Sequence, residues 1–122
     1  MDDRDRHEEA VLTASQQRAL LMLGYLYLRM GQGKRARKLF AALVALDKDD
    51  GWARRGLAAA CLALGEGEAA LEHIDKAIGS TPLPSRDAAL HLLRARALWL
   101  TGRTDEAQNA VHAWLAAGGA RQ

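Results

Sequence analysis

The side chains in this sequence that could do metal or acid–base chemistry are its four histidines. His73 and Asp75 lie two residues apart, and residues with that spacing on a helix face in different directions. His91 and His112 have no cysteine or carboxylate near them in a metal-binding pattern, and His7 lies in a charged N-terminal segment. We therefore expect surface or structural histidines, with no metal site and no catalytic residue.

The one cysteine and the short motifs also give no reason to expect an enzyme. Cys61 has no second cysteine to pair with, which excludes an intrachain disulfide and a multi-cysteine metal site and fits a reducing compartment. The chain has no G-x-S-x-G nucleophile motif, no P-loop and no H-E-x-x-H zinc motif. The sequence predicts a protein without enzymatic activity and without cofactors.

A basic cluster, Lys34, Arg35, Arg37 and Lys38, is the remaining group with chemical potential. No aromatic residue interleaves with it, and the net charge of the chain is only +2, so the pattern favours a solvated convex face over a nucleic-acid site. Docking on an acidic surface of a second protein is the alternative. We expect no nucleic-acid partner.

The elements that carry these residues are predicted to be helices. The sequence is 49% hydrophobic but only 5% aromatic, it has two prolines, and alanine and leucine dominate its apolar residues. Residues 1–12 are expected to form a disordered acidic tail, and residues 118–122 a frayed C-terminus. The acidic start does not resemble a signal peptide, and the apolar run 19–28 is too short to span a membrane. We expect a cytoplasmic protein without membrane insertion.

An internal repeat organises the chain. Three glycines each precede an alanine by five residues; a larger apolar residue follows that alanine by four, and a small residue precedes the glycine by seven. The repeats are 34 and then 37 residues apart. The glycines are Gly31, Gly65 and Gly102, and the alanines are Ala36, Ala70 and Ala107. The larger apolar residues are Phe40, Ile74 and Val111, and the small residues are Gly24, Ala58 and Ala95. This pattern resembles the tetratricopeptide repeat, a hairpin of two helices A and B.

The repeat predicts an all-α fold, in which three tetratricopeptide-like helical hairpins stack as a short right-handed α-solenoid. We place the domain at residues 13–117, with repeats near 17–50, 51–84 and 88–117. Thr13 and Gln16 form a capping box at the first helix, and the segment with Pro82 and Pro84 ends the fourth. The predicted helices are 14–30, 34–46, 51–64, 67–79, 86–101 and 104–117.

Helix A of each such hairpin lines the concave wall of the stack, so the inward positions of these helices are the candidate binding site. They form an apolar groove with two tryptophans, a tyrosine and arginines, which is typical of a binding hot spot. A partner helix would place its anchors at i, i+3, i+4 and i+7. The predicted partner-binding residues are Arg18, Leu21, Tyr25, Leu28, Trp52, Arg55, Leu62, Leu92, Arg96 and Trp99. The alternative is that Trp52, Leu62 and Trp99 are ordinary core residues.

The same positions argue against one use of such grooves. Tetratricopeptide domains that clamp a C-terminal carboxylate, as in binding Hsp90 or Hsp70, need lysine and asparagine at fixed inward sites. Tyr25, Ala59 and Leu92 occupy or neighbour those sites here. We do not expect a carboxylate clamp.

The segment LTASQQRALLMLGYLYLRMGQGKRARKLFAALVALD resembles the start of the type III secretion chaperones called SctY, or YscY. The similarity lies in Leu12-Thr13, Gln16-Gln17, the apolar run into Gly24, the Gly31 turn and the aliphatic end at residues 43–46. Arg54-Arg55 and Trp99 are also similar. Lys48 departs from the repeat pattern, which usually has proline there.

The resemblance implies a small cytoplasmic chaperone that binds a secreted SctX-like protein in its groove and, with it, contacts the export-gate protein SctV. It implies no catalysis and no cofactor. Translocator and needle-subunit chaperones of the same systems are alternatives, as are a generic protein–protein adaptor and an RNA-binding helical repeat. A large exposed apolar groove further predicts a partner-bound complex, or a homodimer when the partner is absent.

Overall fold

The computed structural model describes residues 12–80 and 88–118, with no account of the side chains of residues 78–80. All regular structure in these residues is helical. Every helix end agrees with its prediction to within one residue, except the start of α6, which follows residues that are not described. The helices are α2 (Ala14–Arg29), α3 (Gly33–Leu46), α4 (Gly51–Ala63), α5 (Gly67–Ser80), α6 (Ala88–Leu100) and α7 (Thr104–Ala116).

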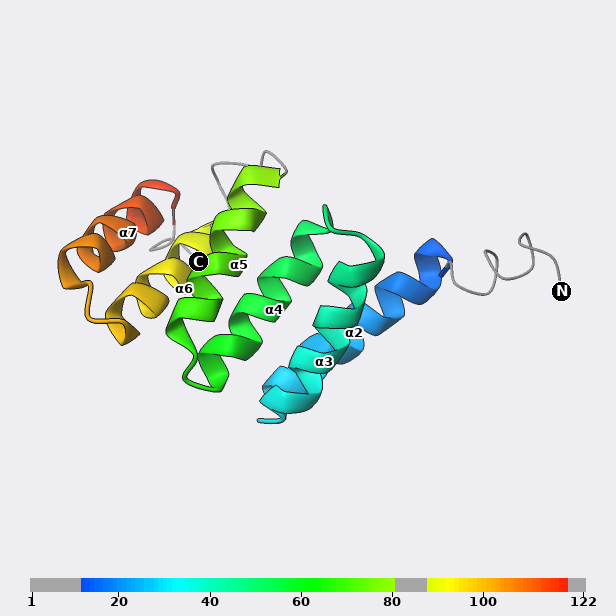
Figure 1. Cartoon of the computed structure of the whole chain (residues 1–122). Coiled ribbons are helices and arrows are strands. Elements are labelled where there is room, and N and C mark those ends of the chain that lie inside the picture. The colour runs from blue at the N-terminus through cyan, green and yellow to red at the C-terminus, as the bar shows by residue number, and fades with distance from the viewer. Residues whose placement is uncertain (1–11, 81–87, 119–122) are drawn as a thin grey trace, which may run out of the picture.

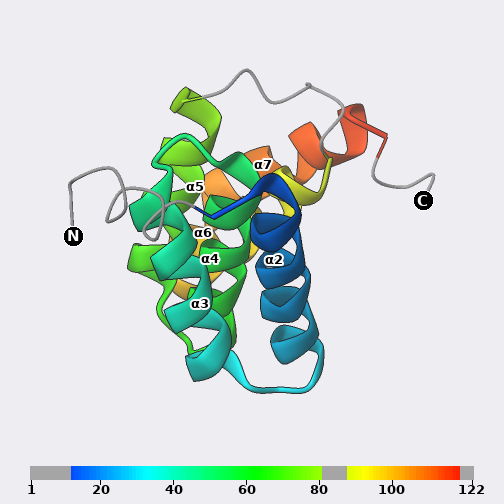
Figure 2. The same cartoon turned by 90° about the vertical axis from the view of Figure 1, so that its right-hand side faces the viewer.

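The helices form three hairpins that follow one another along the molecule, from the blue α2 to the red end of α7 in Figure 1. Within each hairpin the two helices pack together. Between hairpins, α3 packs on α4 and α5 packs on α6. In addition, α2 contacts α4, and α4 contacts α6. Seen after a quarter turn in Figure 2, α2 and α3 stand side by side in front of the later hairpins. The predicted all-α stack of helical hairpins is confirmed for the described residues.

Each hairpin turns on a glycine with positive φ. Gly31, Gly65 and Gly102 have φ of 75°, 76° and 79°, a region that other L-residues enter only with strain. After each glycine, the next N–H donates to a carbonyl five residues back, as in the 2.8 Å bond from Gln32 N to Tyr27 O. These bonds make the Schellman motif, which satisfies the last carbonyls of a helix. The predicted turn glycines are confirmed.

The helix starts are also fixed by local hydrogen bonds. The backbone N–H of Gln16 donates to Thr13 Oγ1 at 3.1 Å, and the Thr13 N–H donates to Gln16 Oε1 at 2.9 Å, which completes the predicted capping box. Asp50 caps α4 by accepting from the N–H of Ala53 at 3.1 Å. Leu12, which we assigned to the tail, packs half-buried against the core instead.

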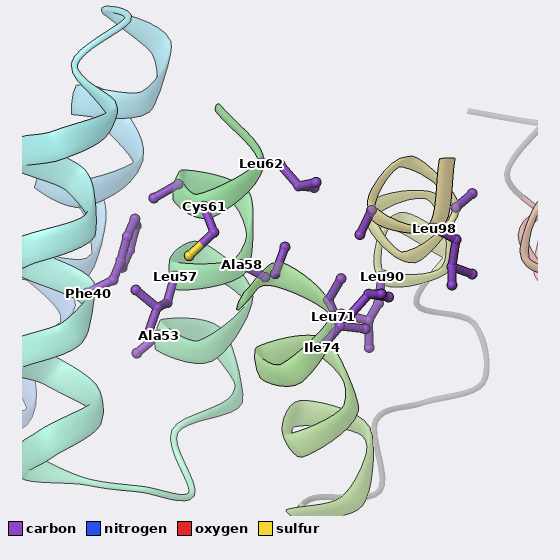
Figure 3. Packing of buried hydrophobic residues seen from close by; sticks show 14 of the residues in the cluster. Phe40, Ala53, Leu57, Ala58, Cys61, Leu62, Leu71, Ile74, Leu90 and Leu98 are labelled. Carbon is purple, nitrogen blue, oxygen red and sulfur yellow. The ribbon is translucent and has the colours of Figure 1, made fainter. Parts of the chain in front are cut away.

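The core lies between the layers of helices and is built from the repeat residues. Phe40 is fully buried where α3 meets α4, and Ile74 is fully buried where α5 meets α6 (Figure 3). Gly24 and Gly56 leave the space for the Phe40 ring: a Cβ on Gly24 would lie 2.6 Å from Cζ of that ring, and one on Gly56 would overlap it. The small and large residues of the motif are therefore paired for packing.

Several sequence predictions lie outside the described residues. They concern most of the acidic tail, the connection with Pro82 and Pro84, and the last four residues. Among the helices within 12–80 and 88–118, none has the combination of length and apolarity that crossing a membrane requires.

Candidate functional site

Helices α2, α4 and α6 differ from the rest of the chain in charge. Together they contain six arginines and no aspartate or glutamate: Arg18, Arg29, Arg54, Arg55, Arg94 and Arg96. Two of these serve the fold. Arg54 is buried, and Arg94 Nε lies 3.7 Å from Asp75 Oδ1 on α5. The row of A helices is therefore cationic, without an acid of its own to neutralise it.

One hollow along this row, which we call the arginine pocket, lies among α2, α4 and α6. Its volume is about 430 Å³. Three arginines surround a floor made mainly of alanine and leucine side chains. The lining residues are Tyr25, Leu28, Arg29, Arg55, Ala59, Ala89, Leu92, Leu93 and Arg96.

A second and larger hollow, which we call the tryptophan pocket, lies between α6 and α7 with one residue from α4. Its volume is about 710 Å³. The lining residues are Leu62, Leu92, Ala95, Arg96, Trp99, Leu100, Ala107, Gln108, Val111 and His112. Leu92 and Arg96 line both pockets, so the two hollows adjoin at α6, and we refer to them together as the groove.

Tyr25 is held rigidly at the α2 side of the groove. Its hydroxyl donates to the backbone carbonyl of Trp52 at 2.9 Å, and its ring meets the edge of Phe40 with centroids 5.0 Å apart. Burial raises the pKa of Tyr25 to about 12; the nearby Asp50 also raises it, and Arg55 lowers it. The hydroxyl therefore stays protonated at neutral pH and keeps donating to Trp52.

Trp52 and Arg55 form a pair beside Tyr25. The Arg55 guanidinium carbon lies 4.4 Å from the centre of the Trp52 ring, a cation–π contact. Burial lowers the pKa of Arg55, and Tyr25 acts in the opposite direction. Trp52 is 60% exposed, so this pair lies at the surface. Arg55 also lines the arginine pocket.

The structure brings most of the predicted site residues together. Tyr25, Leu28 and Arg55 line the arginine pocket, Leu62 and Trp99 line the tryptophan pocket, and Leu92 and Arg96 line both. Arg18, Leu21 and Trp52 line neither pocket.

The alternative that Leu62, Trp52 and Trp99 are core residues holds for Leu62 but not for the two tryptophans. Leu62 is 6% exposed and belongs to the core, although its side chain also forms part of a pocket wall. Trp52 and Trp99 are 60% and 66% exposed, so neither is a core residue in the described part of the chain.

The sequence analysis missed the contribution of α7. Ala107, Gln108, Val111 and His112 line the tryptophan pocket, but they lie on a B helix, and the inward-position rule selects A helices only. Val111 is the third-repeat counterpart of Phe40 and Ile74. The signal was available in the repeat itself: a large apolar residue of a last repeat has no later hairpin in the pattern to cover it.

The remaining chemical candidates have structural roles. No group of three or more histidine, cysteine, aspartate or glutamate side chains in the described residues could hold a metal ion. Cys61 is buried, which raises the pKa of its thiol, as expected of a core cysteine. His73 Nδ1 lies 3.4 Å from Arg54 Nη1, whereas Asp75 approaches Arg94, so the two indeed face different helices.

The basic cluster on α3 also follows its predicted surface role. Lys34, Arg35 and Lys38 are exposed. Arg37 makes a two-pronged ion pair with Glu66, with Nη1 at 2.7 and 2.8 Å from the two carboxylate oxygens. That pair links α3 to the turn of the next hairpin.

Comparisons with known proteins agree with this architecture. Two family models described as tetratricopeptide repeat match residues 21–83 and 88–113. Among solved structures, 25 chains match. One is titled "Second TPR of Spaghetti (RPAP3) bound to HSP90 peptide SRMEEVD"; it superimposes with a TM-score of 0.72 at 21% sequence identity, over 82% of this chain and 90% of that chain. No curated protein matches. Since the first family model alone covers more than half of the sequence, the chain belongs to the tetratricopeptide repeat family.

Proposed function

We propose that this chain is a protein-binding adaptor that holds a segment of another protein in the groove formed by the arginine and tryptophan pockets. The observation that carries the proposal is that the two pockets adjoin at α6, where Leu92 and Arg96 line both. A groove with an exposed tryptophan, arginines and an apolar floor has the composition of a binding hot spot.

The kind of ligand is supported by the structural comparison. The protein in that solved structure is bound to an HSP90 peptide, SRMEEVD. For this chain we infer a peptide or protein segment as ligand. Tyr25, Ala59 and Leu92 occupy or neighbour the sites where a carboxylate clamp would need lysine or asparagine. The chain's groove is therefore proposed to recognise side chains of the ligand rather than its C-terminus.

Trp99→Ala is the variant that tests the adaptor function. Trp99 is 66% exposed, so its removal is expected to leave the free energy of unfolding nearly unchanged while weakening partner binding by about 2 kcal/mol or more. Tyr25→Ala is less informative, because Tyr25 also packs on Phe40 and bonds to Trp52. The partner would be isolated by affinity purification, identified, and its binding to purified wild type and variant measured by calorimetry.

Lys38→Glu on α3 is the matched control, because Lys38 is exposed and lines neither pocket. The groove assignment would be wrong if this control weakened binding as much as Trp99→Ala. It would also be wrong if Trp99→Ala lowered stability as much as it lowered affinity.

A narrower function is a cytoplasmic type III secretion chaperone, for which the support is the resemblance of residues 12–47 to the SctY family. In that function the groove would hold an SctX-like secreted protein, and the pair would contact SctV. Co-expression with a candidate SctX-like protein tests it: a stable heterocomplex that Trp99→Ala disrupts is expected. A chain that purifies alone beside such a partner would leave the general adaptor.

A further inference from the structure

We propose that the groove selects a protein segment with carboxylate side chains at the arginine pocket and a large apolar side chain in the tryptophan pocket. This inference rests on the proposed adaptor function and adds the chemistry of its ligand. It follows from two independent features: the charge of the A helices and the packing at the start of each B helix.

The first feature is the absence of acids along α2, α4 and α6, whose 42 residues include no aspartate or glutamate. Arg29, Arg55 and Arg96 reach the arginine pocket from three different helices. One carboxylate that acts on Tyr25 in this pocket is Asp50, which also caps α4. Three cations converging on a mainly apolar hollow favour a ligand that supplies negative charge.

The second feature concerns what covers the tryptophan pocket. The first two B helices begin with glycines, and each packs against the end of the next A helix. A Cβ on Gly33 would lie 3.3 Å from Leu64, and a Cβ on Gly67 would lie 3.1 Å from Leu100 Cβ and 3.2 Å from the Ala97 carbonyl oxygen. These glycines let the following hairpin approach closely.

The third B helix begins instead with Thr104, at the repeat position of Gly33 and Gly67. A threonine side chain at this position would keep a further hairpin farther from α7 than α4 lies from the start of α3, or α6 from the start of α5. The tryptophan pocket is therefore not shaped for another repeat of the same kind. Its apolar wall suits a large apolar side chain of a ligand, with Trp99, Leu100 and Val111 as contacts.

Because Arg96 and Leu92 line both pockets, one ligand segment can meet both features at once. The acidic part would lie over α2 and α4 and the apolar anchor would lie between α6 and α7. A second copy of this chain is a less suitable occupant, since a cationic groove facing its own copy would place like charges together.

The test begins with a displayed library of random peptides of about 15 residues, which as a helix would be roughly 22 Å long. The full chain is the target. Enriched peptides are expected to combine aspartate or glutamate in one part with tryptophan, phenylalanine or leucine in another. A synthetic peptide of the most enriched sequence, amidated at its C-terminus, is then titrated by fluorescence anisotropy.

Arg96→Glu and Trp99→Ala are each expected to weaken this peptide by about tenfold or more, whereas Lys38→Glu should change its affinity by less than about threefold. Arg96→Glu and Lys38→Glu change the net charge equally, so they separate a local contact from a general attraction. Replacing the acids of the peptide with their amides should remove the difference between wild type and Arg96→Glu. Thermal unfolding of each variant checks that the fold is intact.

Two results would overturn the proposal in distinguishable ways. Enriched peptides that carry no acids, or that lose affinity with Trp99→Ala but not with Arg96→Glu, would reject the acidic ligand and leave the adaptor function standing. No enriched peptide, or peptides indifferent to both groove variants, would count against the acidic ligand and the groove together. A peptide that binds only with a free C-terminal carboxylate would also reject recognition through side chains.

Discussion

The first and the last hairpins of this protein use the same motif residue in opposite ways. Phe40, on the first hairpin, is fully buried because the second hairpin covers it and Gly56 leaves space for its ring. Val111 takes the same repeat position on the last hairpin, yet it is only half-buried and lines the tryptophan pocket. A motif residue therefore stabilises the stack where a described hairpin covers it, and lines an open pocket where no described hairpin does.

Shortening Phe40 and Val111 to alanine is the strongest test of this difference between the two hairpins. Phe40→Ala is expected to lower the free energy of unfolding by about 3–5 kcal/mol, because it leaves a cavity in a closed interface. Val111→Ala should cost about 1 kcal/mol, because its pocket is already open to solvent. Urea unfolding followed by circular dichroism measures both. Equal losses would mean that the last hairpin is covered in the folded protein, and Phe40→Leu provides a milder variant should Phe40→Ala fail to fold.

The fit between Phe40 and its glycines gives a second, smaller effect. A methyl group at position 56 would overlap the Phe40 ring, so Gly56→Ala is expected to destabilise the fold by about 1–3 kcal/mol. The ring is fully buried and cannot swing away.

Phe40→Leu provides the control for that effect, because a smaller side chain makes room for the methyl group. The double variant should therefore be more stable than the sum of the two single losses predicts. Strict additivity would show that the cost of Gly56→Ala does not arise from contact with the Phe40 ring.

The sequence predicts those features of the architecture that are set by interactions between residues close together in the chain. The helix ends were predictable to within a residue because turns and caps are local: Gly31 ends α2, and Thr13 with Gln16 begins it. The pairing of Gly24 with Phe40 was predictable in kind, since it recurs with the period of the repeat. These features need no knowledge of distant parts of the chain.

The candidate site was predictable only in part, because a pocket depends on which surfaces remain uncovered. The inward-position rule selected Tyr25, Arg55 and Trp99. It could not show that Trp52 would turn to the surface and hold Arg55, which depends on a side-chain contact. Nor could it include His112, since the role of α7 arises from the absence of a following hairpin in the described residues.

The turns of the first and last hairpins should not differ in the way that the burial of Phe40 and Val111 does. Gly31 and Gly102 have nearly the same positive φ, and a Cβ at either position would meet no atom within 4 Å. Alanine at either site is therefore expected to cost about 1–2 kcal/mol through backbone strain alone. Equal shifts of the urea midpoint would place the difference in side-chain packing. A negligible cost for Gly102→Ala would show instead that the last turn is itself less ordered.

The smallest expected effect concerns pH, and it arises at His73, which contacts the buried Arg54. Burial lowers the pKa of His73, and the adjacent Arg54 lowers it further, as does Lys76, while Glu72 acts against them. In the unfolded chain the pKa of a histidine is about 6.5. Below that value the unfolded state binds a proton that the folded state resists, so stability should fall as the pH drops through 6.5 toward the lower pKa of the folded state.

His73→Gln removes this proton and should reduce the loss of stability between about pH 7.5 and about pH 5. Urea unfolding at each pH provides the measurement. If His73→Gln leaves the slope of stability against pH unchanged, the contact between His73 and the buried Arg54 does not control the response to acid.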